Sequence, residues 1–241
     1  MKSAALTDIG RQRALNQDFI FRSDEAIGLL PSLYIVADGM GGHKAGDYAS
    51  RFCVEDFIKE ARTGKFKTLL GGLESIINIV NEHVYNKSVT VPEYKGMGTT
   101  LVAAVVDENT VTVSNVGDSR MYLFSENEGL KQITVDHSLV ENMIRVGKLE
   151  RKEAAHHPKK NVITRAIGVD SSVEPDFYEI DLEKGDIILL CSDGLSNMVD
   201  DDRITDCLKE TKDLDEKARE LVDYANERGG KDNISVVLIE I

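Results

Sequence analysis

The sequence contains no tryptophan, four prolines and three cysteines among its 241 residues. The cysteine number is odd and no C-x-x-C pair is present, so neither a disulfide framework nor a cysteine-based metal site is expected. Proline is scarce, and no tract rich in proline, glycine or serine marks a linker between domains. We therefore expect a single domain that covers residues 1–241.

Long apolar runs are also absent. The longest uncharged ones, such as Leu101–Val106 and Ile187–Cys191, have the length of a strand, whereas a membrane helix needs about 18 residues or more. The N-terminus shows no apolar segment of a secretion signal. These absences predict a cytoplasmic protein with no membrane association.

Positive charge is in deficit. The chain has 29 basic and 42 acidic residues, which gives a formal net charge of −13. An acidic surface repels nucleic-acid backbones, so no nucleic-acid partner is expected. Composition leaves two interpretations open: the acids serve solubility, or some of them gather to bind cations.

The apolar residues, 41% of the chain, fall into short strands and amphipathic helices. Helices are expected around Ala49–Ala61 and Leu69–Val84, with a later helix capped by Asp213 and ended by Gly229. Thr99–Ser125 is expected to form a meander of consecutive strands. Because strands and helices do not alternate strictly, we expect an α+β fold of mainly antiparallel sheets covered by helices. The expected strands are Ser3–Thr7, Asp18–Arg22, Leu33–Ala37, Thr99–Asp107, Thr110–Val116, Arg120–Phe124, Phe177–Asp181, Asp186–Cys191 and Ile234–Ile239.

Four aspartates stand beside glycine or asparagine at the edge of an apolar strand. Asp38, Asp118 and Asp193 are expected to follow a strand, and Asp232 to precede one. Each alone is ordinary turn chemistry. In an antiparallel sheet, however, the end of one strand lies beside the start of its neighbour, so all four can meet at one rim. Clustered carboxylates need cations to stay ionised, and their oxygens suit Mg²⁺ or Mn²⁺.

Arg13 precedes an expected strand by a short polar stretch. One interpretation is a solvated surface charge. The other is a planar fork that binds a phosphate group through two parallel hydrogen bonds.

The residues themselves exclude two classes of enzyme that act on phosphate groups. A cysteine phosphatase needs arginine six positions after its cysteine, where this chain has Lys59, Asn197 and Asp213. A P-loop enzyme needs serine or threonine after a Gly-Lys pair. Here Gly230-Lys231 is followed by Asp232.

The chain resembles the metal-dependent protein phosphatase family, also called the protein phosphatase 2C family, in its compact bacterial form. The motifs that carry the resemblance occur in the family's order and span nearly the whole chain. They are Arg13…Asn16-Gln17-Asp18, Asp38-Gly39-Met40-Gly41-Gly42-His43, Gly96-Met97-Gly98-Thr99-Thr100, Asn115-Val116-Gly117-Asp118-Ser119-Arg120, Ile163-Thr164-Arg165-Ala166-Ile167-Gly168, Ser192-Asp193-Gly194-Leu195 and Gly230-Lys231-Asp232-Asn233.

The resemblance implies a β-sandwich of two antiparallel sheets with helices on both outer sides, a four-layer αββα arrangement. It also implies a flap subdomain at about 137–168 beside the site. The implied activity is hydrolysis of phosphoserine and phosphothreonine in proteins by a water that two Mn²⁺ or Mg²⁺ ions share. A cognate serine/threonine kinase is the implied opposing enzyme, and we expect a monomer.

The resemblance also assigns the metal ligands by position. Asp38 is expected to bridge two metals, and the carbonyl of Gly39 to bind one of them. Asp193 and Asp232 complete the other. Asp118, together with Asp193, is expected to serve a third, weaker metal.

Further roles follow from matching positions. Arg13 matches the arginine that binds phosphate, and Asp18 a residue that supports metal-bound waters. The chain departs from the animal members at Met40, where they carry a histidine proposed to protonate the leaving alkoxide. That role falls to His43 or to a metal-bound water.

Two alternatives stay open. An inactive relative would act as a binding module, although such relatives typically lose metal carboxylates and this chain keeps them. Within the enzyme class, a phosphatase of anti-anti-sigma proteins is the second substrate choice, but such enzymes usually carry an additional sensor domain.

Overall fold

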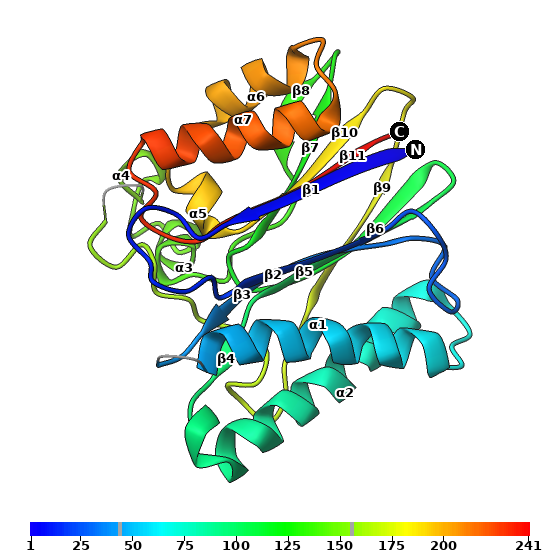
Figure 1. Ribbon diagram of the computed structural model, residues 1–241, viewed down its shortest axis with the longest axis vertical. Helices are drawn as coiled ribbons and strands as arrows, with labels where there is room; N and C mark the ends of the chain where they lie inside the picture. Colours follow the sequence, from blue (N-terminus) through cyan, green and yellow to red (C-terminus); the bar gives the residue numbers. More distant parts are fainter. Residues whose placement is uncertain (43–44, 155–156) are drawn as a thin grey trace.

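The structure, a computed structural model, describes residues 1–42, 45–154 and 157–241. These residues form two antiparallel β-sheets packed face to face, with helices outside each of them (Figure 1). One sheet has the strand order β1-β11-β10-β7-β8 and the other β2-β3-β5-β6-β9, with β4 paired to β3. The strands are β1 (Lys2–Asp8), β2 (Asp18–Ser23), β3 (Leu33–Met40), β4 (Gly98–Thr99), β5 (Leu101–Asp107), β6 (Thr110–Val116), β7 (Arg120–Ser125), β8 (Gly129–Gln132), β9 (Asp176–Asp181), β10 (Ile187–Cys191) and β11 (Ile234–Glu240).

The helices divide between the two outer faces. Two long ones, α1 and α2, cover the β2–β9 sheet, whereas α6 and α7 cover the other (Figure 1). Asp213 begins α7 in a capping box with Glu216, as its position predicted. No helix in the described ranges is long and apolar enough to span a membrane. The helix bounds are α1 (Ala45–Thr63), α2 (Leu69–Thr90), η1 (Pro92–Tyr94), α3 (Leu139–Arg145), α4 (Arg151–Ala154), α5 (Asp193–Ser196), α6 (Asp201–Lys209) and α7 (Leu214–Glu227).

Apolar cores fill the spaces between the layers. Along β3, Leu33 and Ile35 join the core under α1 and α2, whereas Tyr34 and Val36 join the core between the sheets. A further core lies under α5, α6 and α7. Strands buried on both faces explain the near-continuous apolar runs of the sequence. The predicted four-layer αββα sandwich is confirmed.

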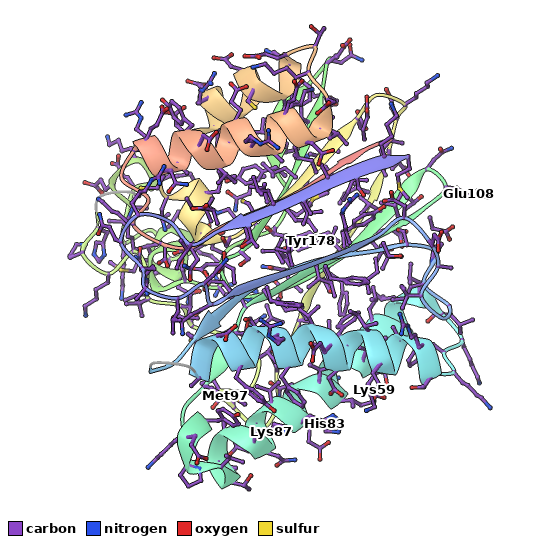
Figure 2. The ribbon with its side chains drawn as sticks, viewed as in Figure 1. Lys59, His83, Lys87, Met97, Glu108 and Tyr178 are labelled. Atoms are coloured by element: carbon purple, nitrogen blue, oxygen red, sulfur yellow. The ribbon has the colours of Figure 1, made fainter. Side chains whose placement is uncertain are left out.

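The predicted meander over Thr99–Ser125 is wrong in its last strand. β5 and β6 do form a hairpin, whose tip carries Glu108 in the left-handed region (φ 50°; Figure 2). β7, however, pairs with β10 and β8 in the opposite sheet. Gly117, at φ 112°, lies where the chain crosses between the sheets. This crossing places the neighbouring Asp118 at a corner of the sandwich.

Candidate metal centre

The four strand-edge aspartates line one cavity of about 270 Å³. Asp118 follows β6, Asp193 follows β10 and begins α5, and Asp232 precedes β11. These three positions relative to the strands agree with the sequence prediction. Asp38 differs, because it lies inside β3, where it pairs with Asp18 of β2. The strand is longer than its apolar run because β4 extends the pairing to Met40.

The backbone N–H and carbonyl of Asp38 are both hydrogen-bonded to Thr100, and the residue lines the cavity. Its N–H donates to Oγ1 of Thr100 at 2.9 Å, and its carbonyl accepts from the Thr100 N–H at 2.9 Å. A Cβ atom on Gly39 would lie 2.0 Å from the carbonyl oxygen of Gly46. The glycine of this Asp-Gly pair therefore permits the start of α1 to approach the strand; it does not form a hairpin turn.

The loop that carries Arg13 is tied to the turn that carries Asp232. Asn233 donates from Nδ2 to the carbonyl of Leu15 at 2.9 Å and accepts at Oδ1 from the N–H of Gln17 at 2.8 Å. Nη2 of Arg13 lies 2.6 Å from Oδ2 of Asp232. The Arg13 side chain is 47% exposed, so its guanidinium stands at the mouth of the cavity beside a candidate ligand.

Asp18 is buried behind the cavity. Its Oδ2 accepts hydrogen bonds from the hydroxyls of Ser192 and Ser235, each at 2.7 Å. Its Oδ1 is buried and has no hydrogen-bond partner among the described residues. Burial raises the pKa of Asp18 to about 7, against the two serine donors, which lower it. Asp18, the first residue of β2, is thus hydrogen-bonded to Ser192, the N-cap of α5. Its other carboxylate oxygen, Oδ1, accepts no hydrogen bond from the described residues.

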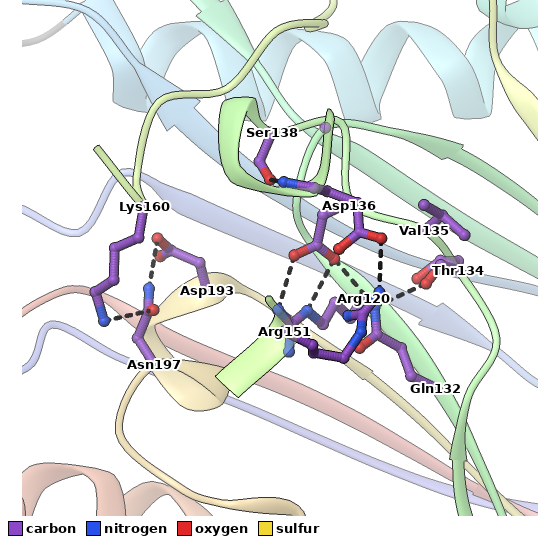
Figure 3. A network of polar contacts seen from close by, with 12 residues as sticks. Arg120, Gln132, Thr134, Val135, Asp136, Ser138, Arg151, Lys160, Asp193 and Asn197 are labelled. Atoms are coloured by element: carbon purple, nitrogen blue, oxygen red, sulfur yellow. Dashed lines mark hydrogen bonds and ion pairs between the residues drawn. The ribbon is translucent and has the colours of Figure 1, made fainter. Parts of the chain in front are cut away.

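Burial also raises the pKa values of Asp38, Asp118 and Asp193. It is the largest cause for Asp38, whose pKa lies well above the usual range, for Asp118 (about 8) and for Asp193 (about 6). Neighbouring carboxylates add to the shifts of Asp38 and Asp118. For Asp193, the charge of Asp232 adds to the shift, whereas Asp38, Arg13 and Arg120 lower it. The nearby Arg120 is held by Asp136 through two hydrogen bonds of 2.9 and 2.7 Å (Figure 3). The acidic side chains of the cavity therefore outnumber the basic side chains that could neutralise them.

This charge predicts how the metal-free protein responds to pH. The folded state keeps protons on Asp18, Asp118 and Asp193 at pH values where the unfolded chain has lost them, so the free energy of unfolding falls as pH rises. Each such proton contributes about 1.4 kcal/mol per pH unit. Chelator-treated protein should be less stable at pH 8 than at pH 5.5 in urea unfolding.

Salt and manganese serve as controls in that measurement. High salt screens surface repulsion and should leave most of the loss in place. Mn²⁺ should reduce the loss at pH 8, because a cation then takes the place of the protons. A metal-free stability that rises from pH 5.5 to 8 would contradict this electrostatic account.

The residues fit divalent cations in donor chemistry. Carboxylate oxygens and the Gly39 peptide carbonyl are hard ligands, which suit Mg²⁺ and Mn²⁺. Oδ1 of Asp193, like that of Asp18, is buried without a partner among the described residues. Among the described residues, no group of three or more acidic, histidine or cysteine side chains is already arranged so that it could hold a metal ion. A bound ion would therefore have to draw these mutually repelling carboxylates together.

The structure adds Asn161, which the sequence did not single out, to the lining of the cavity. Asn161 and Ile163, from the segment predicted as the flap, line the cavity. Met40 lines it too, so the position of the animal histidine holds a side chain that cannot donate a proton. His43, the candidate general acid, lies outside the described residues. Only the position of Asn161, two residues before the Ile163–Gly168 motif, could have pointed to it.

The sandwich of antiparallel sheets, with partly buried carboxylates and an arginine gathered at one cavity, has the fold and brings together the residues that the resemblance to metal-dependent phosphatases implied. The sequence model of the family "Protein phosphatase 2C" matches residues 17–234, and the chain belongs to that family. It is a metal-dependent serine/threonine protein phosphatase, as the resemblance implied.

Similar proteins span the whole chain. The serine/threonine phosphatase stp of Listeria monocytogenes is 41% identical over 97% of this chain and 93% of its own. The serine/threonine phosphatase of S. agalactiae has a TM-score of 0.92 at 40% identity, covering 100% of this chain and 99% of that one. The catalytic domain of the phosphatase PstP, solved with two manganese ions, has a TM-score of 0.86 at 33% identity, covering 99% and 97%.

Proposed function

We propose that Asp38, the Gly39 carbonyl, Asp193 and Asp232 hold two divalent ions, Mn²⁺ or Mg²⁺, in the 270 Å³ cavity. Asp118, with Asp193, serves a third and weaker ion. The observation that carries the proposal is the convergence of these partly buried carboxylates on one cavity, together with the raised pKa values of Asp38, Asp118 and Asp193. The two manganese ions of the PstP structure support the number for that protein and suggest it for this one.

Bound divalent ions polarise phosphoryl oxygens and lower the pKa of water, which supplies the nucleophile without a covalent enzyme intermediate. The protein's own residues position the reactants. Arg13 offers a planar fork at the mouth of the cavity and exchanges Asp232 for the phosphoryl oxygens as the substrate enters. Asp18, fixed by two serine hydroxyls, presents its free oxygen from behind as an acceptor for waters of the site.

The substrates are phosphorylated proteins, and we propose that a serine/threonine kinase supplies them. A phosphoserine or phosphothreonine forms only by phosphoryl transfer to a hydroxyl, so a phosphatase of this class needs such an enzyme upstream. We further propose a cytoplasmic monomer with one catalytic domain over 1–241 and a flap at about 137–168.

A metal-replacement assay tests the function. Chelator-treated protein with Mn²⁺ should release phosphate from a phosphothreonine peptide, and removal of the ion should lower the rate by about 10³-fold or more, because the cations supply several kcal/mol of charge stabilisation. Phosphate release measured with and without Mn²⁺ decides the matter. Intact Mn²⁺ binding without turnover would favour the binding-module alternative.

A further inference from the structure

A chain of two hydrogen bonds connects the flap segment, residues 137–168, to the candidate ligand Asp193 (Figure 3). Nζ of Lys160 donates to Oδ1 of Asn197 at 3.1 Å, and Nδ2 of Asn197 donates to Oδ2 of Asp193 at 3.0 Å. Asn197 is the C-cap of α5, the helix that Asp193 begins, so the second bond spans one helical turn. All three residues line a cavity of about 510 Å³ beside the metal centre.

Asn197 matches both of its neighbours in only one orientation. A carboxylate accepts hydrogen bonds and cannot donate them, whereas an ammonium group donates and cannot accept. The amide must therefore turn its NH₂ group to Asp193 and its carbonyl to Lys160. Lys160 thus reinforces the orientation in which Asn197 holds the aspartate.

The held oxygen leaves the other oxygen of Asp193 available. Oδ2 is engaged by Asn197, while Oδ1 is buried without a hydrogen-bond partner among the described residues. Groups that orient a metal ligand from behind typically change metal affinity or activity by about 10- to 100-fold when they are removed. Under the proposed function, on which this inference rests, Asn197 is such a group for Asp193.

Lys160 also lies on the segment that forms the wall of the metal centre. The next residue, Asn161, lines the 270 Å³ cavity. Shortly after it, the N–H of Thr164 donates to the carbonyl of His137 at 2.7 Å and closes the base of the flap segment. The contact between Lys160 and Asn197 therefore joins the C-terminal part of the flap segment to α5, the helix that carries Asp193.

We propose that Lys160, acting through Asn197, is a positioning residue for Asp193, so that docking of the flap segment and binding of divalent ions favour each other. The coupling is reciprocal. If a docked flap segment increases the affinity for divalent ions, then bound ions must stabilise the docked segment by the same free energy.

Mn²⁺ titration of chelator-treated protein by calorimetry tests the proposal. Asn197→Leu should raise the Kd for Mn²⁺ by about 10-fold or more, and Lys160→Met by a smaller factor of about 3- to 5-fold. Lys160→Arg keeps a cationic donor and should stay near the wild-type Kd. The double variant should be no weaker than Asn197→Leu alone, because both changes break one chain of contacts.

Lys159→Met is the matched control, since Lys159 is exposed and precedes Lys160 directly. Its Kd should equal that of the wild type, and metal-free thermal unfolding of each variant checks that it folds. Hydrogen exchange gives a second readout: Mn²⁺ should slow exchange over residues 159–164 in the wild type and much less in Lys160→Met.

The outcomes separate this inference from the proposed function. If the wild type binds no Mn²⁺, or Asp193→Asn binds it unchanged, both fail. If Asp193→Asn weakens binding but Lys160→Met behaves like Lys159→Met, the positioning role of Lys160 is wrong and the metal centre stands. Effects of Lys160→Met and Asn197→Leu that multiply in the double variant would also overturn it.

Discussion

Asp38→Asn is expected to lower kcat by about 10³-fold or more, the largest effect of any single substitution in this account. The change removes the charge proposed to lie between two cations, whose stabilisation of the transition state is worth several kcal/mol. The same change should stabilise the metal-free protein, because burial and four neighbouring carboxylates disfavour an ionised Asp38. Steady-state kinetics with saturating Mn²⁺ and thermal unfolding in chelator measure the two effects.

The opposite signs of these effects distinguish loss of the site from loss of the fold. A misfolded variant would lose activity and stability together. Asp107→Asn is a matched control, since Asp107 is exposed at the end of β5 and lies outside the cavity. It should change neither quantity. An Asp38→Asn variant with undiminished turnover would contradict the assignment of Asp38 as a ligand.

Arg13→Ala is expected to lower kcat/KM for a phosphothreonine peptide by about 10²-fold, within the range seen when one preorganised donor to a developing charge is removed. Mn²⁺ affinity should not weaken, because Arg13 pairs with Asp232 and competes with the ions for that carboxylate. Arg13→Lys should recover only part of the loss, since an ammonium group cannot form the two parallel hydrogen bonds of a guanidinium.

Arg11→Ala on the same exposed loop is the control for Arg13, and its kcat/KM should stay near the wild-type value. Kinetics and Mn²⁺ titration on the same samples separate substrate anchoring from metal binding. A loss of activity in Arg13→Ala that follows a matching loss of Mn²⁺ affinity would show that Arg13 supports the ions and does not anchor phosphate.

Much of the fold follows from local signals, and the exceptions have physical causes. The helix after Asp213 and the hairpin of β5 and β6 are set by a cap and by a turn, which are local. The crossing of β7 to the other sheet is not set by a local signal. A Gly-Asp turn between two apolar strands has the same sequence pattern whether the second strand pairs with the first or joins the opposite sheet. Helix α6 is not among the helices that the sequence predicts, although Asp200 caps it and Ile204 and Leu208 repeat at helical spacing.

The candidate site divides in the same way. The strand edges predicted where Asp118, Asp193 and Asp232 lie, but not that Asp38 lies inside β3, and the individual roles of all four came from the family resemblance. The serines that hold Asp18 are 174 and 217 residues away along the chain, so no local pattern reveals them. The contact between Lys160 and Asn197 likewise depends on packing of the flap segment against α5. The predicted flap at 137–168 and the single-domain organisation stay predictions.

Anomalous X-ray scattering at the manganese edge, from crystals of this protein grown with Mn²⁺, tests the central claim most directly. The account predicts peaks in the 270 Å³ cavity, with Asp38 in direct contact with two neighbouring ions and Asp193 and Asp232 each in direct contact with one of them through a carboxylate oxygen. An empty cavity in protein that hydrolyses phosphothreonine under the same Mn²⁺ concentration would contradict it.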